Sequence, residues 1–315
     1  MKVKLLSDIE LGAVISGIDL LDLSSDSQKS IRELLWKYKV LCFHTQDLSF
    51  RDLSQVASVF GEIFKTPAQG QALSNEFPWI QRVIRDKDSQ PYFLYGGGWH
   101  SDNAALETRP AYTMLYSVKA PSIGGNTRFK SQTLVYETVS DSVKETLQDA
   151  SVGCSWTQTD LRTAFFSNGT IPFGSDSFHS KVFTEEEYKS MCKDIPKFVE
   201  VDKDFKDKKY VSYQKAVIQH PHTKERVFNI SPSYTNKVRN CSEENSKEWI
   251  AQVVQTQMES SVVEVQWSDH MITIWDNRLV LHQATESDPL QERIMFRVMI
   301  ADPEDKVQET YQFVK

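Results

Sequence analysis

The sequence has few cysteines, no long apolar run and no cluster of basic residues. Its four cysteines lie far apart in 315 residues, without a CxxC spacing. This favours reduced thiols that pack as small apolar side chains over a disulfide framework or a zinc ribbon. No stretch of about 18 uncharged apolar residues is present, and acidic residues interrupt Met1–Leu23, so neither a transmembrane segment nor a signal peptide is expected. These absences predict a cytoplasmic protein without a membrane partner.

Acidic residues slightly outnumber basic ones. The chain has 36 Lys and Arg against 43 Asp and Glu, which gives a net charge of −7. Because no basic run is long enough to follow a phosphate backbone, we expect no nucleic-acid partner. The sequence leaves the oligomeric state open, a homo-oligomer included.

No internal repeat, low-complexity tract or linker divides the chain, so a single domain over residues 1–315 is predicted. A hydrophobic share of 40% is sufficient for a sizeable core. Two stretches, near 66–98 and 157–210, are predicted to be lid insertions, since long irregular segments in a compact domain are usually binding loops.

Helical and β-type patterns alternate along the chain. Helical spacing predicts helices over residues 24–37, 49–60, 131–148 and 246–260. Ser49 is a suitable N-cap of the second helix, and Gly61 follows it at the C′ position, where a positive φ is easiest. Short β-type runs predict strands at 12–20, 40–44, 99–106, 111–118, 126–130, 211–219, 227–230, 271–275 and 293–300. This pattern predicts a mainly β protein with flanking helices, of the sandwich or jelly-roll kind.

His100 and Asp102 form a candidate metal-binding pair. Residues i and i+2 of a strand point to the same face, so an imidazole nitrogen and a carboxylate oxygen could reach one ion. The pair is weak evidence alone, but His282 follows a distant β-type run and would complete a triad of two histidines and one carboxylate. Such a triad suits Fe(II) and leaves three coordination positions open for a chelating substrate and O₂.

His220 and His222 are a rival metal candidate with the same i, i+2 spacing. A polar turn, Thr223–Glu225, follows them, and no carboxylate stands at a matching spacing. We therefore interpret this pair as part of a surface hairpin.

Two arginines stand out in the last predicted strand. Arg293 and Arg297 are separated by an even number of positions, so both guanidinium groups project from one face. If that face is interior, each group needs an anionic partner, and the planar fork of arginine suits a carboxylate ligand. The alternative is a solvated edge with Glu292 nearby.

Several separated motifs, taken in order, resemble the taurine dioxygenase and 2,4-D dioxygenase (TauD/TfdA) family of Fe(II)- and 2-oxoglutarate-dependent dioxygenases. These motifs are Gly12–Leu20, Phe60–Glu62, Trp99–Asp102, Gly124–Thr127, His220–Asn229, Trp275–Arg278, His282 and Arg293–Arg297. They cover nearly the whole chain apart from residues 66–98 and 157–210. The resemblance implies a double-stranded β-helix, or jelly roll, and an oxidoreductase that uses non-haem iron, O₂ and 2-oxoglutarate as co-substrate.

The resemblance also implies roles for individual residues. The iron ligands would be His100, Asp102 and His282. Arg293 would hold the distal carboxylate of 2-oxoglutarate together with the Thr127 hydroxyl, and Arg297 would contact the acidic group of the prime substrate. The implied reaction is hydroxylation of a C–H bond in a small anionic molecule, with release of succinate and CO₂.

Departures from the family pattern concern the substrate. Taurine-using members have an Asn shortly before the metal His, where this chain has Tyr-Gly-Gly-Gly at 95–98, and no substrate His is evident around 69–72. Taurine itself is therefore not expected. Aromatic residues at 91–95, 165–166 and 173 could line a roomier pocket or only pack. They leave open a biosynthetic desaturase or hydroxylase of an amino-acid-derived metabolite.

Two further outcomes compete with hydroxylation. Halogenating relatives replace the metal carboxylate with a small residue, whereas Asp102 is present here. A non-catalytic metal- or ligand-binding jelly roll would keep the triad for folding and would form no succinate. An open ligand set beside two inward arginines has little purpose in a structural site, which favours the enzyme.

Overall fold

The computed structural model describes most of the chain. The described residues are 1–64, 73–74, 76–85, 96–104, 109–155, 211–288, 291–305 and 310–311. Most of the predicted lid insertion near 66–98 and all of that at 157–210 lie outside these residues, as do the aromatic positions at 91–95, 165–166 and 173. The lids and the single domain over residues 1–315 therefore stay predictions.

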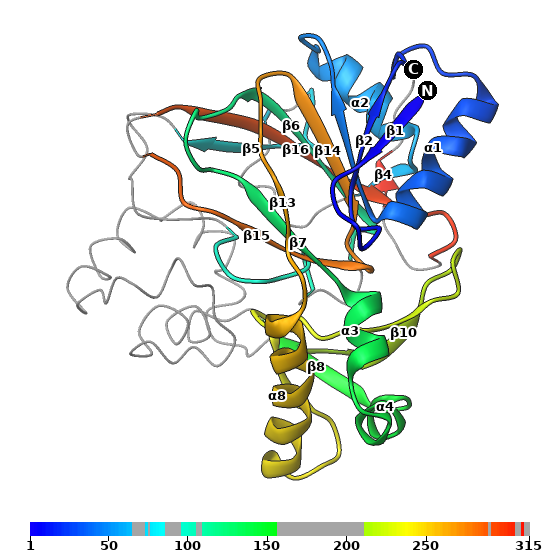
Figure 1. Cartoon of the computed structure of the whole chain (residues 1–315), viewed down its shortest axis with the longest axis vertical. Helices are drawn as coiled ribbons and strands as arrows, with labels where there is room; N and C mark the ends of the chain where they lie inside the picture. Colours follow the sequence, from blue (N-terminus) through cyan, green and yellow to red (C-terminus); the bar gives the residue numbers. More distant parts are fainter. Residues whose placement is uncertain are drawn as a thin grey trace.

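A mixed sheet of nine strands forms the largest layer of the fold (Figure 1). Its strands are β1 (Lys2–Leu5), β2 (Ala13–Ser16), β3 (Val40–His44), β4 (Glu62–Phe64), β5 (Ile80–Arg85), β6 (Tyr112–Lys119), β14 (Met271–Asp276), β16 (Arg293–Ala301) and β17 (Thr310–Tyr311). They are ordered β1-β2-β3-β14-β6-β16-β4-β17, and β5 also pairs with β16. The central strands β14, β6 and β16 run antiparallel to their neighbours, whereas β2 and β3 are parallel.

A three-stranded sheet packs against one side of the large sheet. Its strands are β13 (Val263–Val265), β7 (Thr127–Ser131) and β15 (Val280–Ala284), in that order. Phe129 of β7 meets Trp275 of β14 edge-on, with ring centroids 5.5 Å apart. Buried Val280, Met271 and Met295 belong to the same apolar cluster. The two packed sheets confirm the predicted mainly β, jelly-roll architecture.

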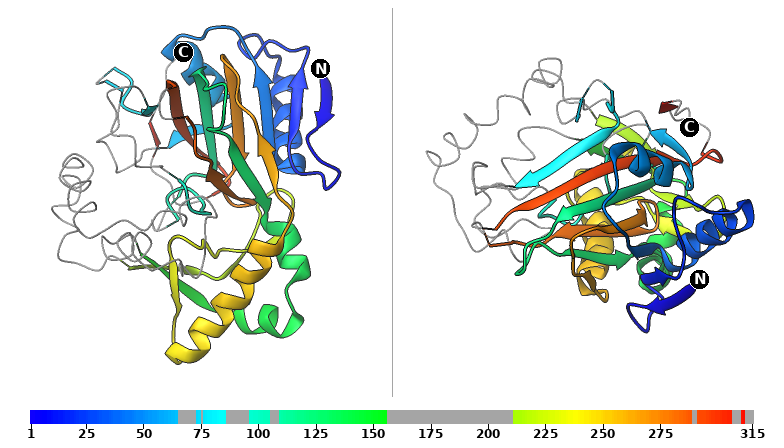
Figure 2. Two further views of the ribbon diagram at one scale, coloured as in Figure 1. Left: turned by 60° about the vertical axis from the view of Figure 1, so that its left-hand side comes forward. Right: turned by 90° about the horizontal axis from the view of Figure 1, so that it is seen from above.

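Two helices belong to the core on the other side of the large sheet. They are α1 (Ser25–Tyr38) and α2 (Phe50–Ser58), and Figure 2 shows α1 alongside the N-terminal strands. Ile31 and Leu35 of α1 and Val56 of α2 are fully buried with Ile272 and Ile274 of β14. These helices begin where the sequence predicts, and Ser49 forms a capping box at the start of α2.

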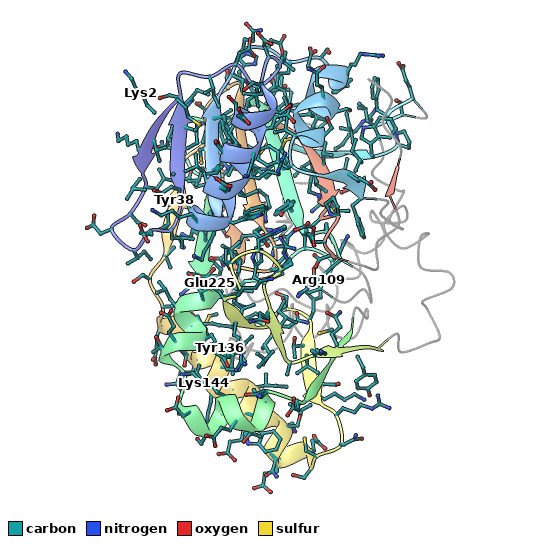
Figure 3. The ribbon with its side chains drawn as sticks, turned by 90° about the vertical axis from the view of Figure 1, so that its right-hand side faces the viewer. Lys2, Tyr38, Arg109, Tyr136, Lys144 and Glu225 are labelled. Carbon is teal, nitrogen blue, oxygen red and sulfur yellow. The ribbon has the colours of Figure 1, made fainter. Side chains whose placement is uncertain are left out.

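The rest of the described chain forms a second layer of helices and short strands at one end of the sheets (Figure 1). Its elements are α3 (Gln132–Thr138), α4 (Asp141–Leu147), α8 (Glu243–Glu259), β8 (Ser151–Ser155), β9 (Val211–Lys215), β10 (Val217–Gln219), β11 (Arg226–Phe228) and β12 (Thr235–Val238). They enclose their own apolar cluster, to which Phe228 and Ile250 belong. Figure 3 shows Tyr136 and Lys144 here, with the ammonium nitrogen 5.7 Å from the centre of the ring.

Three predicted elements are wrong in detail. The strand expected over 211–219 is two strands, β9 and β10, which belong to different sheets. The helix expected over 131–148 is broken, because Val139 is extended and Ser140 starts the new helix α4. The strand expected over 99–106 is a loop in its described part, in which His100 makes one isolated bridge to His282 before the chain turns.

Gly61 does not adopt the positive φ expected after α2. Its φ is outside the left-handed region, but a Cβ atom at this position would clash with the carbonyl oxygen of Ala301. The glycine is therefore required by close packing of α2 and β4 against β16.

The described cysteines behave as expected from their spacing. Cys42 and Cys154 are buried free thiols, and Cys241 is half-buried and free. No helix in the described ranges is both long and apolar enough to cross a membrane.

Candidate active site

His100, Asp102 and His282 lie together in the structure, although 182 positions separate the first from the last. One ligand atom of each lies within 4.8 Å of those of the other two, and all three side chains are buried. The Nε2 atom of His100 is 3.8 Å from Asp102 Oδ1, and that of His282 is 3.7 Å from Asp102 Oδ2. Both imidazoles thus present the same ring nitrogen to one carboxylate.

Backbone pairing brings the loop of His100 to strand β15, which carries His282. The two histidines exchange main-chain hydrogen bonds of 3.0 and 2.9 Å. The Ser101 hydroxyl donates to the carbonyl oxygen of Val280, 3.3 Å away, so the same loop is also held by a side chain. The positions of His100 and Asp102 are therefore set by hydrogen bonds between their loop and β15. They do not come from a regular strand that contains both residues.

The glycines before His100 make room for its ring and orient it. The carbonyl oxygen of Gly98 lies 2.7 Å from His100 Nδ1, which makes Nδ1 the protonated nitrogen and leaves the lone pair on Nε2. Gly96 has a positive φ, and a Cβ atom there would come within 2.9 Å of His100 Cε1. The nitrogen that faces Asp102 is therefore the one able to bind a cation.

The charge state of the triad also suits a cation. Burial lowers the pKa of His100, and burial together with repulsion from His100 lowers the pKa of His282 to about 3. Burial opposes ionisation of Asp102, but the Arg297 guanidinium, with a hydrogen bond from Thr113, outweighs it and lowers the pKa of this carboxyl to about 2. At neutral pH the site therefore consists of two neutral imidazoles and one carboxylate, a donor set that fits a divalent metal such as Fe(II).

Thr127 and Arg293 both lie near the turn of Gly124 and Gly125. Thr127 is buried on β7, and its hydroxyl oxygen accepts a 3.0 Å hydrogen bond from Trp267 Nε1. The hydroxyl hydrogen is thus the part left to donate to a ligand. Arg293 is half-buried and donates from Nε to the carbonyl oxygen of Gly125, 3.3 Å away. The structure thus brings these two predicted cofactor-binding residues to the same turn.

Arg297 points to the triad and not to a solvated edge. Its Nη1 atom donates to Asp102 Oδ1 at 3.1 Å, and its Nε atom donates to Gln81 Oε1 at 2.9 Å. Asp102 is therefore the anionic partner that a partly buried guanidinium requires. Sequence reasoning missed Gln81, which is buried on β5 inside a stretch predicted as a lid, and no motif marks it.

The rival pair His220 and His222 lies in the hairpin between β10 and β11, but His220 is not on the surface as predicted, and His222 is half-buried. His220 is fully buried, and its Nε2 atom is 2.9 Å from Asp276 Oδ2. His222 stacks on Trp36 with ring centroids 3.8 Å apart, and its Nε2 atom is 2.7 Å from Asp302 Oδ2. Both rings are used to hold buried aspartates, and neither belongs to the triad.

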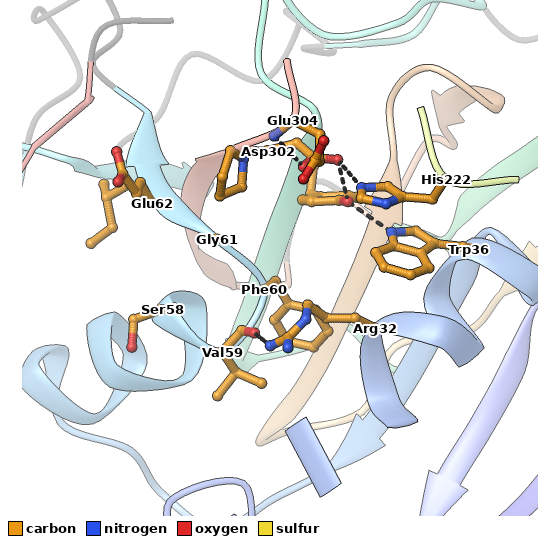
Figure 4. A pocket seen from close by; sticks show the side chains of 13 residues that line it. Arg32, Trp36, Ser58, Val59, Phe60, Gly61, Glu62, His222, Asp302 and Glu304 are labelled. Atoms are coloured by element: carbon orange, nitrogen blue, oxygen red, sulfur yellow. Dashed lines mark hydrogen bonds and ion pairs between the residues drawn. The ribbon is translucent and has the colours of Figure 1, made fainter. Parts of the chain in front are cut away.

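A cavity of about 700 Å³ lies beside this second cluster (Figure 4). Trp36, Tyr112, His222 and Asp302 line it, and none of the triad residues does. Its polar groups bind one another, since Trp36 Nε1 donates to the Tyr112 hydroxyl, which donates to Asp302. We therefore place the candidate active site at the triad.

Comparison with known proteins agrees with this geometry. The chain is 26% identical over 304 residues to the (S)-phenoxypropionate/alpha-ketoglutarate-dioxygenase of Sphingobium herbicidovorans, covering 94% of each chain. It is 25% identical over 306 residues to the alpha-ketoglutarate-dependent sulfate ester dioxygenase of Pseudomonas putida, covering 92% of this chain and 86% of the relative. A relative from Schizosaccharomyces pombe is longer, and the chain spans 66% of its length at 22% identity.

The fold is shared with solved structures. The crystal structure of AAD-2 in complex with Mn(II) and N-oxalylglycine superposes with a TM-score of 0.68 at 21% identity, covering 97% of this chain and 99% of that one. The profile of the family described as "Taurine catabolism dioxygenase TauD, TfdA family" matches residues 3–299. The chain therefore belongs to the TauD/TfdA family of Fe(II)- and 2-oxoglutarate-dependent dioxygenases.

Proposed function

We propose that this protein hydroxylates a C–H bond of a small anionic organic molecule and releases succinate and CO₂ from 2-oxoglutarate. The observation that carries the proposal is the buried group of two neutral imidazoles and one carboxylate, with a guanidinium 3.1 Å from that carboxylate. A metal site of this kind keeps open positions, and the adjacent cation suits an anionic substrate.

His100, Asp102 and His282 are assigned as the iron ligands. When bound, Fe(II) supplies the oxidative chemistry with O₂ and 2-oxoglutarate. The protein contributes position: two ring nitrogens and one carboxylate are already directed to one point, and burial of all three side chains keeps bulk water away from it. No side chain is needed as a general acid or base.

Thr127 and Arg293 are assigned to the distal carboxylate of 2-oxoglutarate. Arg293 offers a planar set of donors for a carboxylate, and Thr127 offers one hydroxyl hydrogen from β7 of the three-stranded sheet. The Arg293 Nε atom donates to the Gly125 carbonyl oxygen at 3.3 Å, which holds the Arg293 side chain at this turn. The pair can therefore fix one end of the co-substrate relative to the triad.

Arg297 is assigned to the anionic group of the prime substrate. A guanidinium has five N–H donors, of which the described bonds to Asp102 and Gln81 use two. The relatives support an anionic substrate, because a phenoxypropionate carries a carboxylate and a sulfate ester carries a sulfate. Gln81 holds the Nε side of Arg297, which limits the orientations from which the arginine can bind a ligand.

The proposal is tested by supplying the purified full chain with Fe(II), 2-oxoglutarate, O₂ and a panel of aryloxyalkanoates, alkyl sulfonates and alkyl sulfate esters. We expect at least one compound to stimulate succinate formation and to gain one oxygen atom, or to yield the fragments of the hydroxylated product. A product lighter by two hydrogens would instead indicate a desaturase. Succinate formation no higher than in His100→Ala for every compound would contradict the proposal.

A further inference from the structure

A chain of buried hydrogen bonds ends on the carboxylate oxygen of Asp102 that Arg297 does not contact. The Thr113 hydroxyl donates to Asp102 Oδ2 at 2.7 Å. Asn277 Nδ2 donates to the Thr113 oxygen at 2.8 Å, and Trp275 Nε1 donates to Asn277 Oδ1 at 3.0 Å. Thr113 lies on β6 opposite Trp275 of β14, so adjacent strands supply the first donor of the chain and the residue that bonds to Asp102.

The indole N–H of Trp275 determines which group donates and which accepts in every hydrogen bond of this chain. An indole N–H can only donate, so the Asn277 side-chain oxygen must face Trp275 and its amide nitrogen must face Thr113. The Thr113 oxygen accepts from that amide, and its one hydrogen is directed to Asp102. Thr113 is fully buried, and the other three residues are at most 4% exposed, so no bulk water competes for these bonds.

The same four-residue motif, Trp275–Arg278, also anchors the end of β14. Asp276 accepts from Arg278 Nε at 2.9 Å and from Nη2 at 2.7 Å, in a bidentate pair that is almost wholly buried. His220 and Asp302 bind the same pair from two other segments. Alternate residues of the motif therefore face two networks, one at Asp102 and one at the buried ion pairs.

We propose that Thr113 is a positioning residue for the Asp102 carboxylate, and that Asn277 and Trp275 keep its hydroxyl in the donating orientation. This inference rests on the proposed iron site. With Oδ2 held by Thr113 and Oδ1 by Arg297, rotation of the carboxylate about its own axis is restrained on both oxygens. Asp102 is thereby held in one orientation relative to both imidazoles before the metal binds.

The test compares metal binding by full-length variants, with Co(II) as the probe and without 2-oxoglutarate. Thr113→Val keeps the shape and loses the hydroxyl, whereas Thr113→Ser keeps the hydroxyl. The matched control is Thr273→Val, because Thr273 is equally buried on β14 but its hydroxyl contacts Cys42 Sγ at 3.5 Å. Thr113→Ala is a second variant without the hydroxyl, and thermal unfolding of each metal-free protein shows whether it is folded.

We expect Thr113→Val to weaken Co(II) binding by roughly 10- to 100-fold and to change the visible Co(II) spectrum, with Thr113→Ser and Thr273→Val close to wild type. A folded Thr113→Val or Thr113→Ala protein with wild-type affinity and spectrum would overturn the positioning role and leave the iron site standing. Equal Co(II) binding by wild type and His100→Ala would overturn the iron site itself, and this inference with it.

Discussion

Gly61 and Gly17 show two different reasons for a glycine. A Cβ atom on Gly61 would clash with the backbone of Ala301, which cannot move without disturbing β16. Gly17 has a φ of +70° with open space around it. We predict that Gly61→Ala lowers the free energy of unfolding by about 3 kcal/mol, through overpacking. Gly17→Ala should cost only about 1 kcal/mol, through its left-handed backbone.

Urea unfolding of the two variants and wild type measures both losses. Equal decreases in the free energy of unfolding would contradict the prediction. They would show that the backbone around Gly61 relaxes, so that the clash with Ala301 costs no more than one unfavourable φ angle.

The sequence predicted those residues of the candidate site whose type and spacing form a recognisable motif. His100, Asp102, His282 and Arg297 were marked by residue type and spacing, and the structure places them together. Thr113 belongs to no such motif, because threonine is common in β-strands. Its contacts with Asp102 and Asn277 are visible only in the folded structure. The burial of His220, predicted to lie on the surface, likewise depends on an aspartate far along the chain, Asp276.

At the scale of elements, Ser49 and Ser140 are both N-cap residues, but of the two only Ser49 makes a capping hydrogen bond with its side chain. Ser49 accepts from Asp52 N, and the Asp52 carboxylate accepts from Ser49 N, whereas Ser140 makes no side-chain cap bond. We predict that Ser49→Ala destabilises the protein by about 1 kcal/mol. Ser140→Ala should change stability by only about 0.5 kcal/mol or less, as an ordinary surface substitution does.

Chemical denaturation of both variants is the measurement. A loss in Ser140→Ala as large as that in Ser49→Ala would contradict the assignment of the capping box as the source of the stabilisation of α2.

Most elements were predictable because their signals are local. Helix α2 follows a capping serine, and β3 occupies residues 40–44 as expected from its apolar run. The strand Ile80–Arg85 was missed because its evidence is long-range: it pairs with β16, more than 200 residues away. Helix α4 was merged with α3 because the apolar spacing continues across Val139, although Ser140 supplies a new start.

At the scale of the whole molecule, buried ionisable groups make stability depend on pH. Burial opposes ionisation of Asp276, but Arg278 outweighs it and holds the pKa of this carboxyl far below its usual value. An unfolded aspartate takes up its proton at about pH 3.9, and the native one at a lower pH, so its stabilisation is lost as the pH falls below about 4.

His282 acts in the same direction at higher pH in the metal-free protein. Burial lowers its pKa from 6.5 to about 3, so between these values the unfolded chain binds a proton that the native chain does not. We predict that the free energy of unfolding decreases as the pH falls from 6.5, and more steeply below pH 4. Urea unfolding at several pH values measures it, and stability that is constant or rising between pH 6.5 and pH 4 would contradict the prediction.

The buried ion pairs and the hydrogen bonds that support Asp102 depend on alternate residues of the motif Trp275–Arg278, which ties the stability of the molecule to its proposed chemistry. Arg278 binds Asp276 and Asp302, while Asn277 and Trp275 support Asp102 through Thr113. The hydrogen bonds that hold Asp102 thus begin at the buried end of β14, although the triad residues themselves lie in the loop of His100 and on β15.

The central claim is that His100, Asp102 and His282 bind Fe(II) together with 2-oxoglutarate. Its most direct test is an anaerobic titration of the metal-free full chain with Fe(II) in the presence of 2-oxoglutarate, followed by visible absorption. We predict that a weak metal-to-ligand charge-transfer band develops in the wild type and is absent in His100→Ala. A band in neither protein, or the same band in both, would contradict the claim.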